Sequence, residues 1–255
     1  MRAAKMRSSR VMATVALCLA AVDPARATGC RFAPQGEGRV VEVIDARTFR
    51  LQDGREVRLA GIEPMDGDAA ALTRLIAGRD VTLHGATDTP DRYGRQPAFA
   101  FLDDATPSVQ SQLLAQGAAL ASLAVLDQDC AADFAASEAS ARQVRAGLWG
   151  QAGVIKNAES PGGVLADVGR FRLVEGRVLS VRTAGATTYL NFGRNWTQDF
   201  AVTISRRMMV TLEAAGISPK SFERRRIRIR GFIERRGGPR IEVVRVGQIE
   251  VAGDK

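Results

Sequence analysis

Polar and apolar residues alternate along several short stretches in the first half of the chain. The clearest are residues 39–44, 48–51 and 56–60, and the pair Asp53-Gly54 separates the last two. A period of two residues indicates β-strands with one buried face, and Asp-Gly is a favoured hairpin turn. Similar runs at 81–84 and 96–102 complete a set of five short predicted strands.

Between and after these strands, apolar residues recur with the spacing of an α-helix. The predicted helices cover residues 69–76, 109–116 and 130–146, and a glycine follows each of them at 78, 117 and 147. Glycine ends helices because it adopts left-handed backbone angles without strain. Short strands with interleaved helices predict an α+β fold, namely a Greek-key barrel of the oligonucleotide/oligosaccharide-binding (OB) type, for a domain at residues 38–150.

The second half of the chain shows a similar order of elements. Strand-like runs occur at 172–181, 187–192 and 200–204, followed by a helix at 208–215 and two more strands at 227–234 and 240–244. This order is again that of a small closed barrel, so we expect a second, OB-like β-barrel domain at residues 170–255. Residues 151–169 contain several glycines and a proline, which predicts a linker.

The first 27 residues have the composition of a secretory signal peptide. Basic residues precede an apolar run at 11–22, and Ala25-Arg26-Ala27 offers small residues for cleavage. The signal predicts a periplasmic or secreted protein, with a lipoprotein signal ending at Cys30 as the alternative. The apolar run is too short for a comfortable membrane span and no later run reaches that length, so no span is expected after cleavage.

Removal of the signal would also remove Cys18 and leave two cysteines, Cys30 and Cys130. An even pair of cysteines in an exported chain favours a disulfide bond. Such a bond would join the entry of the first domain to its last helix.

Charge is distributed unequally between the two halves. Residues 28–150 contain 12 Lys+Arg and 17 Asp+Glu (net −5), whereas residues 151–255 contain 19 and 10 (net +9). In the basic half, alternation places Arg226, Arg228 and Arg230 on one side of a strand, and Tyr189 and Trp196 are aromatic residues that can stack on bases. This half is therefore the candidate nucleic-acid-binding surface, the alternative being a solvated charged face.

Two arginines near carboxylates form the candidate chemical site of the first half. Arg58 lies in the segment 57–66, which also carries Glu63 and Asp66, and Arg95 ends the segment Asp91-Arg92-Tyr93-Gly94-Arg95. A guanidinium group can donate two parallel hydrogen bonds to phosphate oxygens and can stabilise charge on a transferring phosphoryl group. Carboxylates can hold a cation and activate water. The single histidine, His84, and the lack of Cys-x-x-Cys, glycine-rich phosphate-loop and His-Glu-x-x-His motifs argue against zinc sites and nucleotide triphosphate loops.

These segments, together with Gly147-Leu148-Trp149, resemble the thermonuclease (staphylococcal-nuclease-like) family over residues 38–149. The resemblance implies an OB-type barrel, a phosphodiester substrate and a calcium cofactor. It implies catalytic roles for Arg58 and Arg95, and for Asp66 in place of a general-base glutamate. Glu63 then matches a calcium-ligand aspartate, and Asp45 begins the family's D-G-D-T motif, so these two carboxylates are the candidate metal ligands.

The D-G-D-T motif of the family reads Asp45-Ala46-Arg47-Thr48 in this chain, so an arginine replaces a calcium-ligand aspartate. A guanidinium has no lone pair to offer a cation, and it opposes calcium unless it swings away. Arg47 is expected to form a salt bridge with one of the neighbouring carboxylates. We therefore expect a protein that binds nucleic acid with weakened or lost hydrolysis; the alternatives are an active calcium-dependent endonuclease and a non-catalytic envelope interaction protein.

Overall fold

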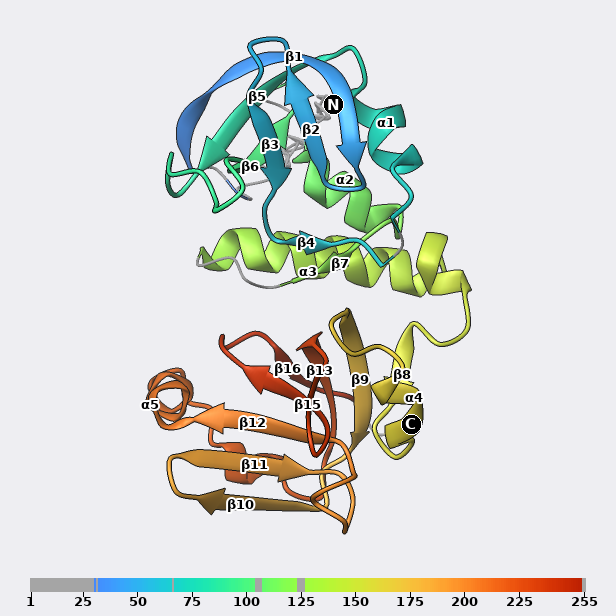
Figure 1. The fold of residues 1–255 in the computed structure, drawn as a ribbon, viewed down its shortest axis with the longest axis vertical. Coiled ribbons are helices and arrows are strands. Elements are labelled where there is room, and N and C mark those ends of the chain that lie inside the picture. The colour runs from blue at the N-terminus through green and yellow to red at the C-terminus, as the bar shows by residue number, and fades with distance from the viewer. Residues whose placement is uncertain (1–29, 31, 66, 104–106, 123–126, 254–255) are drawn as a thin grey trace, which may run out of the picture.

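The computed structural model describes residues 30, 32–65, 67–103, 107–122 and 127–253 (Figure 1). Two predictions from the sequence fall outside these residues. The signal peptide at 1–27 is one, and Asp66, the candidate general base, is the other.

Five strands of the first half close into a barrel, in the order β1 (Ala33–Asp45), β2 (Thr48–Leu51), β3 (Glu56–Leu59), β6 (Gln96–Phe101) and β5 (Asp80–Gly85). Every pair of neighbours is antiparallel except β3 and β6, which run parallel. Two further short strands, β4 (Ile62–Glu63) and β7 (Leu120–Ala121), pair with each other below the barrel (Figure 1). The α+β fold class and the OB-type barrel are confirmed.

The apolar side chains of the alternating strands fill the barrel interior. Phe49 and Leu51 of β2 and Val57 and Leu59 of β3 are buried, while the residues between them in β3 are only partly buried. Phe134 from a helix packs into the same core. Burial of large apolar side chains stabilises a fold by about 1.5–3 kcal/mol each, so this alternation supplies much of the barrel's stability.

Three helices cover the barrel: α1 (Ala70–Ile76), α2 (Val109–Ala115) and α3 (Gln128–Gln143). Side-chain oxygens cap two of them, since Ser108 accepts a hydrogen bond from the Ser111 N–H at 3.1 Å and Asp127 accepts one from the Cys130 N–H at 2.8 Å. Such caps satisfy N–H groups that have no partner inside the helix. Among the described residues, none of the helices combines the length and apolar character needed to cross a membrane.

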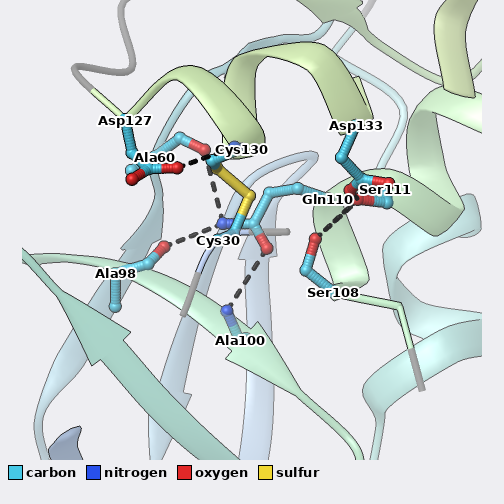
Figure 2. Close-up of a disulfide and its surroundings, with 10 residues drawn as sticks. All are labelled: Cys30, Ala60, Ala98, Ala100, Ser108, Gln110, Ser111, Asp127, Cys130 and Asp133. Carbon is cyan, nitrogen blue, oxygen red and sulfur yellow. Dashed lines mark hydrogen bonds between the residues drawn. A yellow bond between two sulfur atoms is a disulfide. The ribbon is translucent and has the colours of Figure 1, made fainter. Parts of the chain in front are cut away.

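A disulfide bond and a buried amide attach α3 and α2 to the barrel (Figure 2). Cys30 and Cys130, 100 positions apart in sequence, form the predicted disulfide. Gln110 of α2 donates from Nε2 to the Ala98 carbonyl at 2.9 Å and accepts from the Ala100 N–H at 3.2 Å. The amide therefore satisfies strand groups at the edge of β6 that water does not reach.

The strands of the second half are divided between two sheets. One has the order β10 (Ser180–Ala184), β11 (Thr187–Asn191), β12 (Ala201–Ser205), β15 (Gly238–Val243) and β14 (Glu234–Arg236). The other has the order β16 (Ile249–Val251), β13 (Arg226–Phe232), β9 (Phe171–Arg177) and β8 (Ile155–Asn157). Short helices α4 (Pro161–Leu165), α5 (Arg206–Ala214), η1 (Gly147–Gly150) and η2 (Pro219–Phe222) complete the chain.

Two bent strands join these sheets into one ring. At the first bend, Val178 donates its N–H to Arg225 beside β13, whereas Leu179 donates to Asn191 of β11. At the second bend, only Ile233 separates β13 from β14. The resulting order of pairing, with β12 and β15 parallel and α5 between the third and fourth strands, is that of the first barrel. The order of the strands is therefore OB-like, but they form two sheets because strands one and four bend.

Residues 151–169 differ from the predicted linker. They contain β8, which pairs in parallel with β9, and α4, whose Val164 is buried in the second core. Leu148 and Val154 pack with Phe171 and Leu173 in a cluster that joins both halves of the chain. Glycine and proline here shape short turns between packed elements and do not mark a flexible connection.

Candidate functional site

Arg58 and Arg95 approach each other because of the parallel pairing of β3 and β6. Arg58 lies in the middle of β3, opposite Thr48 of β2 on one side and Pro97 of β6 on the other. Arg95 comes just before β6. The parallel register therefore brings the end of the 91–95 loop beside β3, as the phosphate-binding prediction requires.

The 91–95 loop is organised by the carboxylate of Asp91. Its Oδ2 accepts hydrogen bonds from Nε and Nη2 of Arg95 at 2.9 and 2.7 Å, and its Oδ1 accepts from the N–H groups of Tyr93 and Arg95 at 2.9 and 3.1 Å. Gly94 has a φ of 80°, which favours glycine in this turn. Tyr93 is 64% exposed, and its ring contacts the guanidinium groups of Arg92 and Arg95.

The hydrogen bonds from Arg95 hold the pKa of Asp91 at about 2, below the ordinary value of 3.8. A depressed pKa means that Asp91 stabilises the folded loop fully above about pH 4 and that this contribution is lost as pH falls toward 2. We expect a carbon-detected NMR titration to give a midpoint near 2 for Asp91. In Arg95→Gln the midpoint should rise toward 3.8, while that of Asp53, which bonds to Arg55, should not move. A wild-type midpoint near 3.8 would contradict this organisation.

Arg47 lies in the turn between β1 and β2 and turns its side chain toward β4. Its Nη1 contacts the carboxylate of Glu63 and donates to the Ile62 carbonyl at 3.1 Å. Its backbone N–H donates to Asp45 Oδ1 at 2.8 Å. Of Asp45 and Glu63, the two candidate metal ligands that the structure describes, Glu63 forms a side-chain ion pair with Arg47.

Glu63 is held in place by a strand pair outside the barrel. It lies in β4, where it is paired with Leu120 of β7. The Arg47 and Glu63 side chains are only 18% and 17% exposed. Partial burial makes this ion pair less sensitive to salt than an exposed pair, because solvent screens it less.

The charges around Arg58 confirm that the cluster is compact. Burial lowers the pKa of Arg58 below the usual arginine value, and the cations of Arg47 and Arg95 lower it further, while Glu63 and Asp45 act in the opposite direction. Among the described residues, no hydrogen bond or ion pair engages the Arg58 guanidinium. Arg58 is thus the cation of this cluster with donors available for an anionic ligand.

The described donors do not fit a calcium ion. Calcium takes about six to eight oxygen ligands, and carboxylates supply most of the charge. No three His, Cys, Asp or Glu side chains gather at one point within the described part of the chain. Glu63 contacts a guanidinium that has no lone pair, so this candidate metal ligand already has a cationic partner.

The arginines of β13, predicted to face nucleic acid, are held by carboxylates. Arg228 forms two hydrogen bonds with Glu175 Oε2, at 3.0 and 2.6 Å, and Arg226 donates to Glu175 Oε1 at 2.7 Å. Arg230 is buried, and its guanidinium donates to Glu138 of α3 at 3.0 and 3.1 Å. The assignment of Arg230 to a nucleic-acid surface is wrong, because α3 of the first domain covers this side chain; Arg226, on the same side of β13, stays exposed.

Glu138 is a residue that the sequence analysis missed. Its carboxylate accepts hydrogen bonds from the Arg230 guanidinium and, at 2.6 Å, from the Ala121 N–H. A signal was present, since the buried residues of α3 include Cys130, Phe134 and Ala141 at helical spacing, and Glu138 falls on the same stripe. A carboxylate on an apolar stripe indicates a buried cationic partner.

The comparisons with known proteins bear on the first domain. Residues 66–151 match the family model described as Staphylococcal nuclease homologue. The match includes Arg95, α1, α2 and α3, and it begins after Arg58 and Glu63. A search among curated proteins gives no match. The match shows that this chain contains a staphylococcal-nuclease-like domain at residues 66–151, in agreement with the closed five-stranded barrel.

Proposed function

We propose that this is an exported protein that binds the phosphodiester backbone of nucleic acids, and that its metal-dependent hydrolysis is weakened or lost. The phosphate contacts belong to Arg58 and Arg95 in this proposal. Glu63 stands where the family resemblance places a metal ligand and Asp66 where it places the base, while Asp45 begins the motif in which Arg47 replaces the other ligand. The observation that carries the proposal is the contact between Arg47 and Glu63.

Geometry and charge both support the proposed binding of phosphate by Arg58 and Arg95. Arg95 is oriented by two hydrogen bonds to Asp91, so its planar group loses little freedom when a ligand arrives. Arg58 lies next to it in the barrel wall with no ion pair among the described residues. Two neighbouring guanidinium groups match the oxygens of a phosphodiester, which accept bidentate hydrogen bonds.

The loss of hydrolysis rests on the position of Arg47. Hydrolysis by a calcium enzyme needs the ion to polarise the phosphate and to lower the pKa of water. In this chain a fixed guanidinium supplies positive charge at that place, but it cannot bind or activate a water as an ion does. The site therefore keeps electrostatic recognition of an anion and lacks the group that would generate the nucleophile.

A nuclease assay with a matched variant tests the proposal. We expect no calcium-stimulated hydrolysis of single-stranded DNA by the wild-type protein. Arg47→Asp is expected to bind calcium, because it replaces a cation by a third carboxylate beside Asp45 and Glu63. At calcium concentrations about 100-fold above the dissociation constant, binding stabilises the fold by about 2.7 kcal/mol, which raises the melting temperature by about 5–10 °C.

The control for this experiment is Arg74→Asp, which makes the same charge change on α1. Arg74 is exposed and forms no ion pair with a carboxylate among the described residues. Its variant should show no calcium-dependent rise in melting temperature. Calcium-stimulated digestion by the wild-type protein, abolished by a chelator, would instead establish the active endonuclease; absence of both hydrolysis and oligonucleotide binding would leave the envelope interaction protein.

Export is supported by the composition of residues 1–27 and by the disulfide. Disulfides persist in oxidising compartments and are rare in the cytosol. A periplasmic or secreted protein would meet nucleic acid outside the cytosol, where free strands are accessible. Fractionation of cells, followed by mass measurement of the mature chain, tests both the location and the cleavage site.

A further inference from the structure

The second barrel carries a groove on the outer face of its larger sheet. The groove encloses about 620 Å³ and is lined by residues of β10, β11, β12, β14 and β15 and of the 193–199 loop. This volume falls within the range of about 300–1,000 Å³ that is common for ligand sites. The sheet lies on the side of the second domain away from α3 (Figure 1).

Strand alternation explains why Tyr189 faces this groove. In β11 the neighbouring residues Thr188 and Leu190 are buried, whereas Tyr189 is only partly buried. Tyr189 pairs across the sheet with Arg182 of β10 and with Thr203 of β12, so these three side chains share the outer face. An aromatic ring, a cation and a hydroxyl group therefore stand in a row across three strands.

The groove contains cations that differ from the arginines of β13. Arg182 and Arg236 are exposed, and neither has an ion pair among the described residues. Arg240, the third arginine of the lining, is held by Glu234 at 3.0 Å. These unpaired arginines give this face positive charge that is available to a polyanion.

A tryptophan at the rim is presented by a tightly built loop. Trp196 is 78% exposed. Its loop is closed by Asp199, whose Oδ2 accepts the Asn195 N–H at 2.7 Å. The backbone of Gly238 approaches so closely that an added Cβ would lie 2.5 Å from the Asp199 carbonyl oxygen, so this packing requires glycine. A rigid loop that exposes a large ring favours a role in binding, because exposure of the ring costs stability.

One buried polar atom of the lining lacks a partner. Thr203 is 4% exposed, and its Oγ1 makes no hydrogen bond with any described residue. Buried hydroxyl groups are normally satisfied, since leaving one unpaired costs about 1–3 kcal/mol. This hydroxyl group lies beneath the floor of the groove, where neighbouring atoms cover it.

We propose that this groove binds a single-stranded segment of nucleic acid, with bases stacked on Trp196 and Tyr189 and phosphates at Arg182 and Arg236. The inference rests on the proposed function and adds a second contact site to it. A single strand fits better than a duplex because stacking on aromatic side chains requires unpaired bases. Arginine and aromatic side chains together are the combination that single-strand-binding surfaces use.

Oligonucleotide binding by the full chain tests the groove. The probe is a labelled thymidine oligomer of about 12 nucleotides, the length of one OB-fold site, with a duplex of equal length for comparison. Trp196→Ala should weaken single-strand binding by about 5- to 100-fold, and Trp196→Phe, which keeps a ring, should bind within about 3-fold of wild type. Arg236→Glu should weaken binding, whereas Arg235→Glu, the same change on the opposite side of β14, should have a smaller effect.

Fluorescence gives an independent readout. The chain has two tryptophans, and Trp149 packs beside Arg142 in the first domain. In Trp149→Phe the remaining signal comes from Trp196 and should be quenched as the oligonucleotide binds. Absence of quenching, or equal affinity of Trp196→Ala and wild type, would overturn the inference.

The Arg58→Ala variant separates this inference from the proposed function. If Arg58→Ala loses affinity and Trp196→Ala does not, the first domain binds nucleic acid and the groove does not. If Trp196→Ala loses affinity and Arg58→Ala does not, the groove is supported and the proposed phosphate grip fails. Equal affinity for duplex and single strand contradicts base stacking, and lack of binding by the wild type contradicts both proposals.

Discussion

Replacement of Glu138 by alanine is expected to lower the free energy of unfolding by about 3–5 kcal/mol. Glu138 and Arg230 form a bidentate ion pair whose side chains are only 3% and 5% exposed. Loss of the carboxylate leaves the buried guanidinium with only the more distant Glu250 carboxylate, at 3.8 Å, and it removes the acceptor of the Ala121 N–H. The loss of unfolding free energy is therefore larger than the net stabilisation that the ion pair provides. Urea denaturation followed by circular dichroism measures it.

Two matched variants test whether burial of the Glu138–Arg230 ion pair causes the large loss of stability. Glu234→Ala removes the partner of Arg240 from a more exposed ion pair and should cost less than about 1 kcal/mol. The double variant Glu138→Leu with Arg230→Met removes both charges and should recover most of the loss, because neither buried charge is left unpaired. A cost for Glu138→Ala as small as that for Glu234→Ala would contradict a solvent-excluded contact between the two domains.

Loss of Glu138 should also affect the candidate site. Ala121, whose N–H and carbonyl bond to Glu138 and Arg230, lies in β7. β7 pairs with β4, which carries Glu63. The second domain thus supports the strand that positions the partner of Arg47, and hydrogen exchange of β4 should rise in Glu138→Ala along with that of β7.

Removal of the disulfide by the Cys30→Ala, Cys130→Ala double variant is the second large expected effect. Closing a loop of about 100 residues restricts the unfolded chain by nominally about 4.7 kcal/mol. The bond joins the start of β1 to α3, whose Phe134 packs into the barrel core. Its loss should therefore lower the denaturation midpoint and loosen α3 from the barrel.

Reduction of the wild-type protein should reproduce this loss and should leave the double variant unchanged. Titration of free thiols in the unreduced mature chain supplies the control, since the bonded cysteines will not react. Two reactive thiols in the folded protein, or an unchanged midpoint in the variant, would contradict the bond.

The barrel and its helices were predictable because the signals are local. Alternation over β2 and β3, the Asp53-Gly54 turn and the helix-ending glycines act within a few residues of where they occur. The unusual Arg47 was visible in the same way, as a basic residue at a position where the family carries an acid. The linker prediction failed because glycine and proline report turns, while the pairing of β8 with β9 depends on residues far along the chain.

The candidate site was predictable in its residue types and less so in its partners. Sequence order indicated Arg58 and Arg95 as a pair, and the parallel register of β3 and β6 brings them together. For Arg226, Arg228 and Arg230, alternation gave the side of the strand correctly. It could not show that Glu175 and Glu138 from other elements meet that side, whereas Arg182 and Arg236 lack such partners among the described residues.

The sequence by itself thus determined the strands, helices and turns, the cysteine pair, and the replacement of an expected metal-ligand aspartate by Arg47. Only the tertiary structure decided which charges are available to a ligand and which are paired. The physical reason is that backbone propensity and side-chain alternation act over a few residues, while the pairing and burial of a charge depend on groups that approach it from distant segments.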